Sequence, residues 1–309
     1  MVSLSVVIPT HAPRADLLQR TIAGLQAQTL PVEHWQLLLI DNASPKPLAL
    51  DWVSWHPRGR LIREPRLGLT QARLRGLAES TGELLVWVDD DNVLAPDYLE
   101  RMQQAFAAHP ELGAAGGVSE AAVQGSVPHW YRPGLAPLGC RDHGPQDIWM
   151  EWSSADRHYP QAAPIGAGLA IRRSAMWLWA DAVQNDPARL SLGRRGCSLA
   201  SGEDNDINLT LLAAGWRLLY VAGARLTHLI PSQRLELAYQ KRLARASFRD
   251  FVRVLDHHGI RPWQPIPAWT VPLRSAWAWL RYRPWRHPAE AVRWWGALGQ
   301  YEGRALIRS

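Results

Sequence analysis

The sequence predicts an α/β fold in which a mostly parallel, mixed sheet is flanked by helices and followed by a helical C-terminal extension. Through the first two thirds of the chain, short apolar runs alternate with stretches whose apolar residues recur at helical spacing. This alternation is typical of a sheet whose two faces are covered by helices. After residue 230 the pattern changes to long basic stretches that are rich in tryptophan and arginine.

The predicted elements follow one another in strand–helix order. In chain order they are a strand at 5–9, a helix at 16–30, a strand at 36–40, a helix at 69–80, a strand at 84–88 and a helix at 96–109. Gly82 closely follows the helical pattern at 69–80, as glycine does at many helix C-termini. Residues 119–164 carry no assigned element. Residues 165–173 are predicted to form a glycine-bearing turn that runs into a strand. A helix at 207–214 follows the acidic segment 201–206.

Polar residues follow three of the predicted strands directly. Thr10 and His11 come after the first strand, Asp41 after the second, and Asp89-Asp90-Asp91 after the third. Parallel sheets bind ligands outside the carboxyl ends of their strands. Three strand ends that present polar groups therefore indicate a binding site at this edge.

The acidic run at 89–91 is the most informative of these. Three carboxylates in succession repel one another, and burying them unpaired is costly. A hard divalent cation held against phosphate oxygens resolves this conflict, whereas the alternative is a solvated acidic turn. The run alone does not separate these two interpretations, but the other strand ends favour a metal–nucleotide site.

Composition bounds the class of protein. Hydrophobic residues make up 47% of the chain and charged residues 20%, which are globular values. The two cysteines, Cys140 and Cys197, exclude a disulfide framework and lack zinc-ligand spacing, so we expect buried, reduced thiols. The first residues lack the features of a signal peptide, and no run reaches the ~18 apolar residues of a spanning helix. These features predict a cytoplasmic protein that can still lie on a membrane surface.

Charge and tryptophan are concentrated near the C-terminus. From residue 225 onward, 15 Lys and Arg against 5 Asp and Glu give a net charge of +10, while the whole chain carries +6. Seven of the 17 tryptophans lie in the same part. This asymmetry indicates an anionic partner for the C-terminal segment.

An ordered set of motifs resembles the family 2 glycosyltransferases, which have the GT-A fold. The motifs are Ser5-Val6-Val7-Ile8-Pro9-Thr10, Asp41-Asn42-Ala43-Ser44, Arg66-x-Gly68 with Ala72-Arg73, the run from Gly82 to Asp91, the run from Gly166 to Arg173, and Gly202-Glu203-Asp204. The resemblance covers about 3–230. It implies a catalytic domain at 1–230, with a nucleotide-sugar half at 1–118 and an acceptor half at 119–230, followed by the extension at 231–309.

The resemblance also implies roles for the residues at the strand ends. The donor, a UDP-sugar by resemblance, would contact six residues: Pro9, Thr10, Asp41, Arg66, Asp89 and Asp90. Asp91 would ligate Mn²⁺ or Mg²⁺, with His228 as a further ligand. For Asp41 the alternative is the start of an Asx-turn, for Arg66 a surface arginine, and for Asp90 and His228 a structural role.

The acidic segment before the predicted helix at 207–214 implies the catalytic base. By resemblance, Asp204 activates the acceptor hydroxyl, with Glu203 as its neighbour or the alternative base, and the anomeric centre inverts. Capping of a helix N-terminus is the simpler explanation for these acids. Gly166, Gly168 and Trp152 are predicted to contact the acceptor, a glycan or lipid-linked saccharide of polysaccharide biosynthesis.

The extension predicts three helical stretches, at 231–258, 275–283 and 288–298. Tryptophan beside arginine suits an anionic membrane surface, where the rings lie at headgroup level. The alternatives are that these tryptophans cover the protein's own core or form a homodimer interface. Aromatic residues with arginine also bind single-stranded nucleic acid, but no nucleic-acid motif is present and no such partner is expected.

Two other function classes fit parts of the pattern. A nucleotidyltransferase shares metal-holding acids but usually has an early phosphate loop rich in glycine and lysine, which residues 10–14 do not provide. A non-catalytic sugar- or lipid-binding scaffold has no need of both acidic motifs. The sequence therefore predicts a glycosyltransferase.

Overall fold

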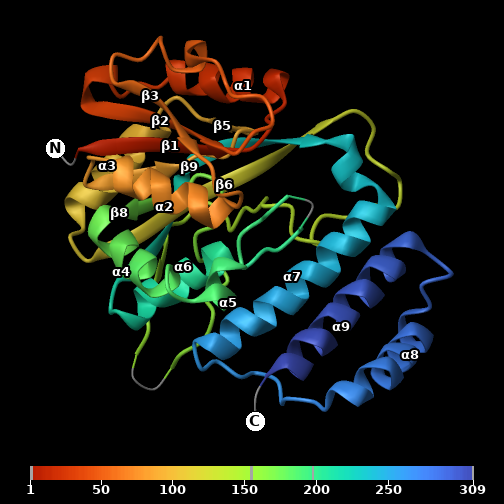
Figure 1. The fold of residues 1–309 in the computed structure, drawn as a ribbon. Helices are drawn as coiled ribbons and strands as arrows, with labels where there is room; N and C mark the ends of the chain where they lie inside the picture. The colour runs from red at the N-terminus through yellow and green to blue at the C-terminus, as the bar shows by residue number, and fades with distance from the viewer. Residues whose placement is uncertain (1–2, 154–155, 197, 308–309) are drawn as a thin grey trace.

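A computed structural model describes residues 3–153, 156–196 and 198–307 of the chain and confirms the predicted fold class. A mixed sheet is flanked by helices (Figure 1). Its strands run in the order β3-β2-β1-β4-β8-β6-β9-β5, and β7 also pairs with β9. The strands are β1 (Leu4–Thr10), β2 (Trp35–Asn42), β3 (Gly59–Glu64), β4 (Leu84–Trp87), β5 (Asn92–Leu94), β6 (Leu112–Gln124), β7 (Ile148–Met150), β8 (Ala170–Arg172) and β9 (Arg217–Pro231).

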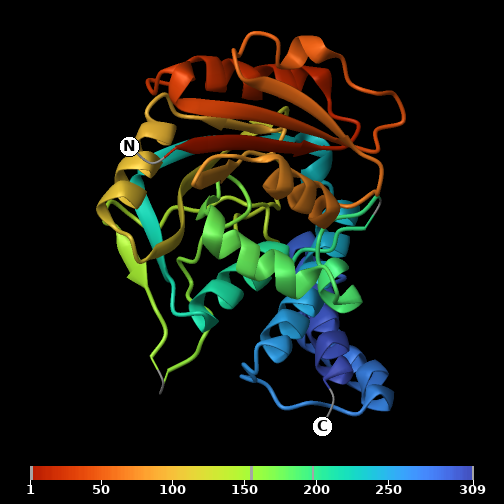
Figure 2. The same cartoon turned by 60° about the vertical axis from the view of Figure 1, so that its left-hand side comes forward.

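The helices cover both faces of this sheet and form the C-terminal extension (Figures 1 and 2). The α-helices are α1 (Ala15–Gln26), α2 (Leu69–Glu79), α3 (Tyr98–Ala108), α4 (Arg173–Val183), α5 (Pro187–Leu190), α6 (Glu203–Ala213), α7 (Leu237–His257), α8 (Val271–Tyr282) and α9 (Pro288–Leu306). The short 3₁₀ segments are η1 (Val32–His34), η2 (Leu50–Trp52), η3 (Ser232–Leu235) and η4 (Ala268–Thr270).

Strand register brings the predicted polar ends to one edge. β1 runs parallel to both β2 and β4, with Thr10 opposite Asp41 and Val7 opposite Trp87. The chain therefore leaves β4 at the same edge as it leaves β1 and β2. The acids that follow Trp87 consequently lie beside Thr10, as the sequence predicted.

Alternating side chains of the central strands feed two separate cores. On one face, Val7, Leu38 and Leu85 join a cluster with residues of α2, α4 and α6. On the other face, Val6 and Leu37 join a cluster with residues of α1 and α3. Burial on both faces explains why these strands appear in the sequence as nearly continuous apolar runs.

Two long strands, β6 and β9, were not predicted. β6 contains the run Leu112-Gly113-Ala114-Ala115-Gly116-Gly117, whose small residues give little strand signal. The register between β6 and β9 shifts at Gly117, where a Cβ atom would lie 1.9 Å from the carbonyl oxygen of Ala224. Glycine is therefore required at this position because the two backbones approach closely. Since glycine has a low strand propensity, the strand could not be predicted from residue preferences.

The C-terminal helices differ in extent from the prediction. The segment 231–258 is not one helix, because β9 continues to Pro231 and η3 precedes α7. Helix α8 begins at Val271, before the predicted 275, and α9 continues to Leu306, beyond the predicted 298. No helix within the described part of the chain is both long and apolar enough to cross a bilayer.

The extension packs against the rest of the protein. Leu243 and Ala244 of α7, with Val292 of α9, share a third apolar cluster with Trp130 and Leu138. Other residues of α7 reach the first core. The boundary predicted at 230 therefore does not separate independent cores, and the domain division stays a prediction.

Helices α7 and α9 approach each other through glycine. A Cβ atom on Gly299 would lie 2.1 Å from the carbonyl oxygen of Arg245, and one on Gly303 would lie 2.8 Å from that of Arg249. The absence of side chains at these positions lets the two backbones come into contact. Because this contact leaves little space between them, α7 and α9 form a tightly packed pair.

Candidate active site

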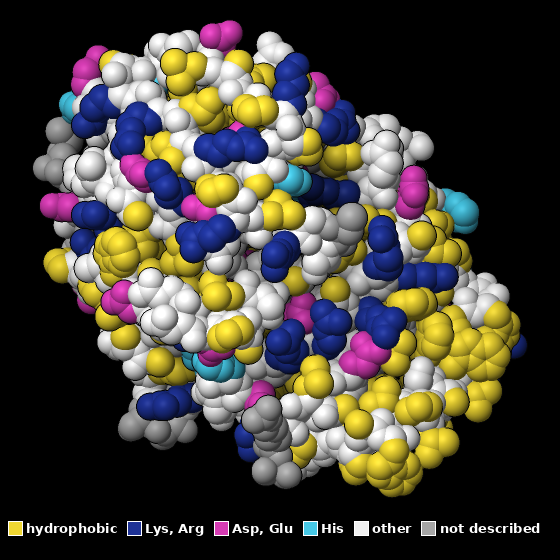
Figure 3. Space-filling view, in the orientation of Figure 1, with side chains coloured by type: hydrophobic (Ala, Val, Ile, Leu, Met, Phe, Trp, Pro, Cys, Tyr) yellow, Lys and Arg dark blue, Asp and Glu magenta, His cyan; other side chains and the backbone are white. Residues whose placement is uncertain are grey.

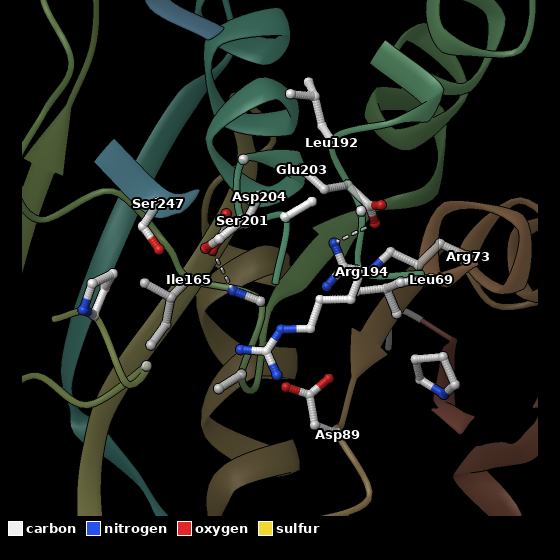
Figure 4. A pocket seen from close by; sticks show the side chains of 18 of the residues that line it. Leu69, Arg73, Asp89, Ile165, Leu192, Arg194, Ser201, Glu203, Asp204 and Ser247 are labelled. Carbon is white, nitrogen blue, oxygen red and sulfur yellow. Dashed lines mark hydrogen bonds and ion pairs between the residues drawn. The ribbon is translucent and has the colours of Figure 1, made fainter. Parts of the chain in front are cut away.

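A cavity of about 680 Å³ opens at the edge where β1, β2 and β4 end. One wall carries Pro9, Thr10 and the acids 89–91, and the opposite wall carries the first turn of α6. Helix α7 closes a third side with Ser247, Phe248 and Phe251. Figure 4 shows Asp89 facing the cavity from below, with Ser201, Glu203 and Asp204 across from it. The cavity thus joins the two acidic motifs that the sequence singled out, more than 100 residues apart.

The buried Asp91 carboxylate is held by two cationic groups. Its Oδ2 lies 2.9 Å from Nη2 of Arg234 and 3.5 Å from Nε2 of His228. Nη1 of Arg234 is also 3.3 Å from Nε2 of His228, so one guanidinium contacts both side chains. Burial raises the pKa of Asp91, but the hydrogen bond and charge of His228 and the charge of Arg234 outweigh it, and the pKa is lowered.

The two preceding acids have the opposite electrostatic balance. Burial and the charge of Asp91 raise the pKa of Asp90 to about 7, although Thr10 donates a hydrogen bond to this carboxylate. The same two causes raise the pKa of Asp89. The charges of Arg73, His228 and Arg194 partly oppose this rise in the pKa of Asp89, and Arg194 extends toward Asp89 across the cavity (Figure 4). A cation bound here would relieve the repulsion among the three acids.

His228 is a cation in this setting. Burial would lower the pKa of its imidazole, but its hydrogen bonds with Asp91 and Cys140 outweigh that and raise the pKa to about 9. The Sγ atom of Cys140 lies 3.6 Å from Nδ1 of His228. Cys140 is exposed, so the expectation of a buried thiol is wrong at this position, and Cys197 lies outside the described residues.

Glu203 and Asp204 begin α6 but have different surroundings. The buried Glu203 carboxylate accepts a hydrogen bond from Thr70, and its Oε1 lies 2.9 Å from Nη1 of the equally buried Arg73. That ion pair is close but not aligned as a hydrogen bond. Burial, which exceeds the effect of Arg73, raises the pKa of Glu203. Glu203 therefore ties α6 to α2, whereas Asp204 faces the cavity.

The Asp204 carboxylate is oriented by backbone groups. Its Oδ2 accepts a hydrogen bond from the backbone N–H of Gly166 at 3.1 Å, and its Oδ1 accepts one from that of Asn205 at 2.9 Å. Gly166 also lines the cavity, and a Cβ atom there would lie 2.8 Å from Nη2 of Arg73. The glycine turn and the acidic motif are thus joined by a hydrogen bond, a contact that the sequence did not predict.

Four residues predicted to contact the donor or acceptor lie outside the cavity wall as the described residues form it. The Asp41 carboxylate accepts backbone N–H groups of Ser44 and Leu48 and pairs with Arg63 at 2.6 Å. The hydrogen bonds from Ser44 and Arg63 outweigh burial and lower the pKa of Asp41. Asp41 therefore starts an Asx-turn, the alternative that the sequence left open, and base binding by Asp41 stays a prediction.

The other three are placed by local structure. Arg66 is exposed and pairs with Glu64 at 3.0 Å. Gly168 has φ of +71°, and its carbonyl oxygen accepts a hydrogen bond from the Tyr98 hydroxyl. The indole N–H of Trp152 donates to the carbonyl oxygen of His158. Their binding roles also stay predictions.

Three arginines line the cavity: Arg73, which stands in one of the sequence motifs but had no role assigned to it, and Arg194 and Arg234, which the sequence did not single out. Arg194 lies in the run Gly193-Arg194-Arg195-Gly196, where glycines on both sides of a basic pair are a recognisable signal of an exposed cationic loop. Arg234 follows β9 by three residues and has no such signal. The three guanidinium groups give the acidic cavity a counterbalancing positive charge.

Comparison with known proteins places this architecture. Residues 5–152 match the family described as glycosyl transferase family 2. Residues 5–152 therefore belong to this family. This chain is 27% identical over 267 residues to an N-acetylglucosaminyltransferase of Sinorhizobium fredii. That alignment covers 82% of this chain and 59% of the relative. It is 35% identical over 112 residues to the succinoglycan biosynthesis protein ExoW of Rhizobium meliloti, about a third of each chain.

Solved structures confirm the GT-A fold. A crystal structure of GalNAc-T7 with UDP, GalNAc and Mn²⁺ superposes with a TM-score of 0.57 at 20% identity, covering 83% of this chain and 48% of that one. A structure of S. aureus TarS 1–349 superposes with a TM-score of 0.51 at 12% identity, covering 98% and 90%. At such identities the likeness concerns the fold alone.

Proposed function

We propose that this protein transfers a sugar from a nucleotide diphosphate sugar, with UDP as the nucleotide, to a hydroxyl group of a saccharide. One observation carries the proposal: the acids after β4 and the Asp204 carboxylate of α6 face one cavity from opposite walls. Family membership and the GT-A fold support it, as do the names of relatives that are N-acetylglucosaminyltransferases.

The donor would bind along the wall at the ends of β1 and β4. Pro9 and Thr10, which line the cavity, would offer backbone and hydroxyl groups to a nucleoside, and Asp89 would accept hydrogen bonds from its ribose. Arg194 and Arg234 line the same cavity and offer guanidinium groups to a diphosphate. The pairing of phosphate with arginine would replace the present contact of Arg234 with Asp91.

A divalent metal ion fits the residues present, although the described side chains form no cluster of three His, Cys, Asp or Glu groups. Asp91 and His228 converge to 3.5 Å, and in the metal-bound state His228 would give up its proton and Arg234 would move off both side chains. These two side chains would hold Mn²⁺ or Mg²⁺, with diphosphate oxygens as further ligands. The ion would neutralise charge that develops on the departing diphosphate.

Asp204 is proposed as the general base. The acceptor hydroxyl oxygen attacks the anomeric carbon, the bond from that carbon to the diphosphate oxygen breaks, and Asp204 takes the hydroxyl proton. Attack opposite to the leaving group inverts the anomeric centre, which fits a base and a phosphate site on opposite walls. Glu203 acts as a positioning residue, because its carboxylate is bound to Arg73 and Thr70.

The acceptor is proposed to be a glycan or a lipid-linked saccharide of polysaccharide biosynthesis. The relatives support this class: ExoW is named for succinoglycan biosynthesis. The acceptor would enter beside Gly166 and Asp204, where the cavity is bounded by Phe248 and Phe251. We propose the cytoplasm as the place of the reaction, at the inner face of the plasma membrane where the acceptor is lipid-linked.

Calorimetric titration with UDP, GDP and dTDP, each with and without Mn²⁺, tests the donor site. We expect one nucleotide to bind in a Mn²⁺-dependent manner, with binding lost in Asp91→Asn and retained in the control Asp97→Asn, whose carboxylate pairs with Arg101 on the surface. Failure of all three nucleotides to bind would reject the glycosyltransferase proposal and favour a non-catalytic scaffold.

A further inference from the structure

Helix α8 presents an uncovered apolar face to the outside. Leu273, Trp277 and Leu280 are 64%, 59% and 61% exposed and follow the spacing i, i+4, i+7 that places side chains on one face of a helix. Trp269, in η4 just before the helix, is 73% exposed. We call these four residues the α8 outer face. Figure 3 shows hydrophobic side chains gathered at this end of the molecule.

The other side of α8 is already used. Its buried residue is Ala278, and the helix packs on α9, which in turn packs on α7 (Figures 1 and 2). The outer face therefore does not cover the protein's own core, which was one of the alternatives from the sequence. A contiguous exposed apolar surface of this kind marks an interaction site.

Arginines border this face without neighbouring acids. Residues 262–289 contain Arg274, Arg281, Arg283 and Arg286 but no Asp or Glu. All four arginines are exposed, and Cζ of Arg281 lies 5.5 Å from the centre of the Trp277 ring. The segment thus combines exposed tryptophan and leucine with uncompensated positive charge.

We propose that the α8 outer face docks on the interface of an anionic lipid bilayer. Its four apolar side chains enter the boundary between headgroups and acyl chains, and the bordering arginines bind lipid phosphates. A second copy of the chain fits this surface less well. Self-association would bring the same arginines together with no acid of the segment to pair with them, and juxtaposed like charges oppose binding.

Docking through α8 also fixes which way the protein faces. Helices α8, α9 and α7 lie in that order from the outside inward (Figures 1 and 2), and Ser247 and Phe248 of α7 line the cavity. The bilayer would therefore lie on the side of α7 opposite the cavity. The proposal does not depend on the donor or on the reaction.

Flotation of the full-length protein with phosphatidylcholine vesicles, with and without phosphatidylglycerol, tests the proposal. We expect binding to the anionic vesicles, weakened by salt. The double variant Trp277→Gln/Leu280→Gln should bind the anionic vesicles on the order of 100-fold more weakly, since each substitution removes an apolar side chain that the bilayer would bury. The matched control is Leu50→Gln, because Leu50 is 63% exposed in η2.

Charge is tested separately. Arg281→Gln/Arg286→Gln should weaken binding about fivefold per arginine, whereas Arg20→Gln, an exposed arginine of α1, should have no effect. Since all substituted side chains are exposed, the variants should keep the thermal transition of the parent protein, as circular dichroism can verify.

Any of three results would overturn the proposal. The first is absence of vesicle binding by the parent protein, and the second is equal binding by the α8 variants. The third is a dimer in lipid-free solution, detected by light scattering, that Trp277→Gln/Leu280→Gln converts to a monomer. That third result would assign the face to contact between two copies.

Discussion

Glu203 and Asp204 are neighbours in the chain, but the structure predicts opposite consequences for their amide variants. Glu203→Gln leaves the Arg73 guanidinium without its counter-charge, and both side chains are almost fully buried, at 3% and 4% exposure. Breaking a buried pair by removing one partner costs about 3 kcal/mol or more. For a chain of this size, such a loss lowers Tm by roughly 6 °C.

Asp204→Asn should cost only about 1 kcal/mol of stability, because the carboxylate accepts two backbone hydrogen bonds at the edge of the cavity and one of them is lost. The amide oxygen can accept one of these. Loss of the general base should instead lower the transfer rate by about 100- to 10,000-fold, with nucleotide binding retained. Thermal unfolding, nucleotide titration and sugar transfer, measured on both variants, separate the two roles.

Glu79→Gln is the matched control for the stability effect. Glu79 pairs with Arg60 and Arg75, which are 51% and 40% exposed, so its loss should cost less than about 1 kcal/mol. A Glu203→Gln protein that unfolds at the parental temperature would refute the role assigned to the buried pair. Full transfer activity in Asp204→Asn would remove Asp204 from the role of base.

Two further predictions concern a buried carboxylate and a helix contact. Asp206 is buried and accepts hydrogen bonds from Trp179, Arg189 and His258. Burial raises the pKa of Asp206, but His258 and Arg189 outweigh burial and lower it. Since the folded pKa lies below the unfolded value of about 3.9, the stabilisation is complete above that pH and is lost as pH falls through the folded pKa. Urea unfolding should show Asp206→Asn destabilised by about 3 kcal/mol at pH 7. This difference in unfolding free energy between the parent protein and the variant should become smaller in acid, and a difference that stayed constant would contradict the prediction. Gly299→Ala should lower the unfolding free energy by about 1–3 kcal/mol in the same assay, because its Cβ atom would lie 2.1 Å from the Arg245 carbonyl oxygen; an unchanged midpoint would show that α7 and α9 can separate freely.

The central sheet could be predicted because its strands are buried on both faces. β1 and β2 are mostly apolar and end in polar residues, and acids follow β4 at 89–91, so composition and position together locate the cavity edge. β6 and its partner β9 were not predicted. β6 contains glycine and alanine where the backbone of β9 must approach closely. Such a requirement depends on the partner strand, which one sequence does not reveal.

The acids of the site were predicted, but most of their partners were not. Asp89, Asp91 and Asp204 stand in recognisable runs, whereas Arg234 reaches Asp91 only because η3 turns the chain back after β9. Asp41 shows the opposite limit. Its place at a strand end suggested a ligand contact, but local N–H groups of its own turn bind the carboxylate.

The position of α7 has a mechanical consequence. Phe248 lines the cavity on one side of this helix and lies against Gly296 of α9 on the other, with a Cβ atom on Gly296 only 3.0 Å from its ring. A Cβ atom on Gly299 would also lie 2.1 Å from the carbonyl oxygen of Arg245, so α7 and α9 are in backbone contact. A displacement of α9 would therefore move Phe248 and change the shape of the cavity wall, and docking of the outer helices would be coupled to occupancy of the cavity.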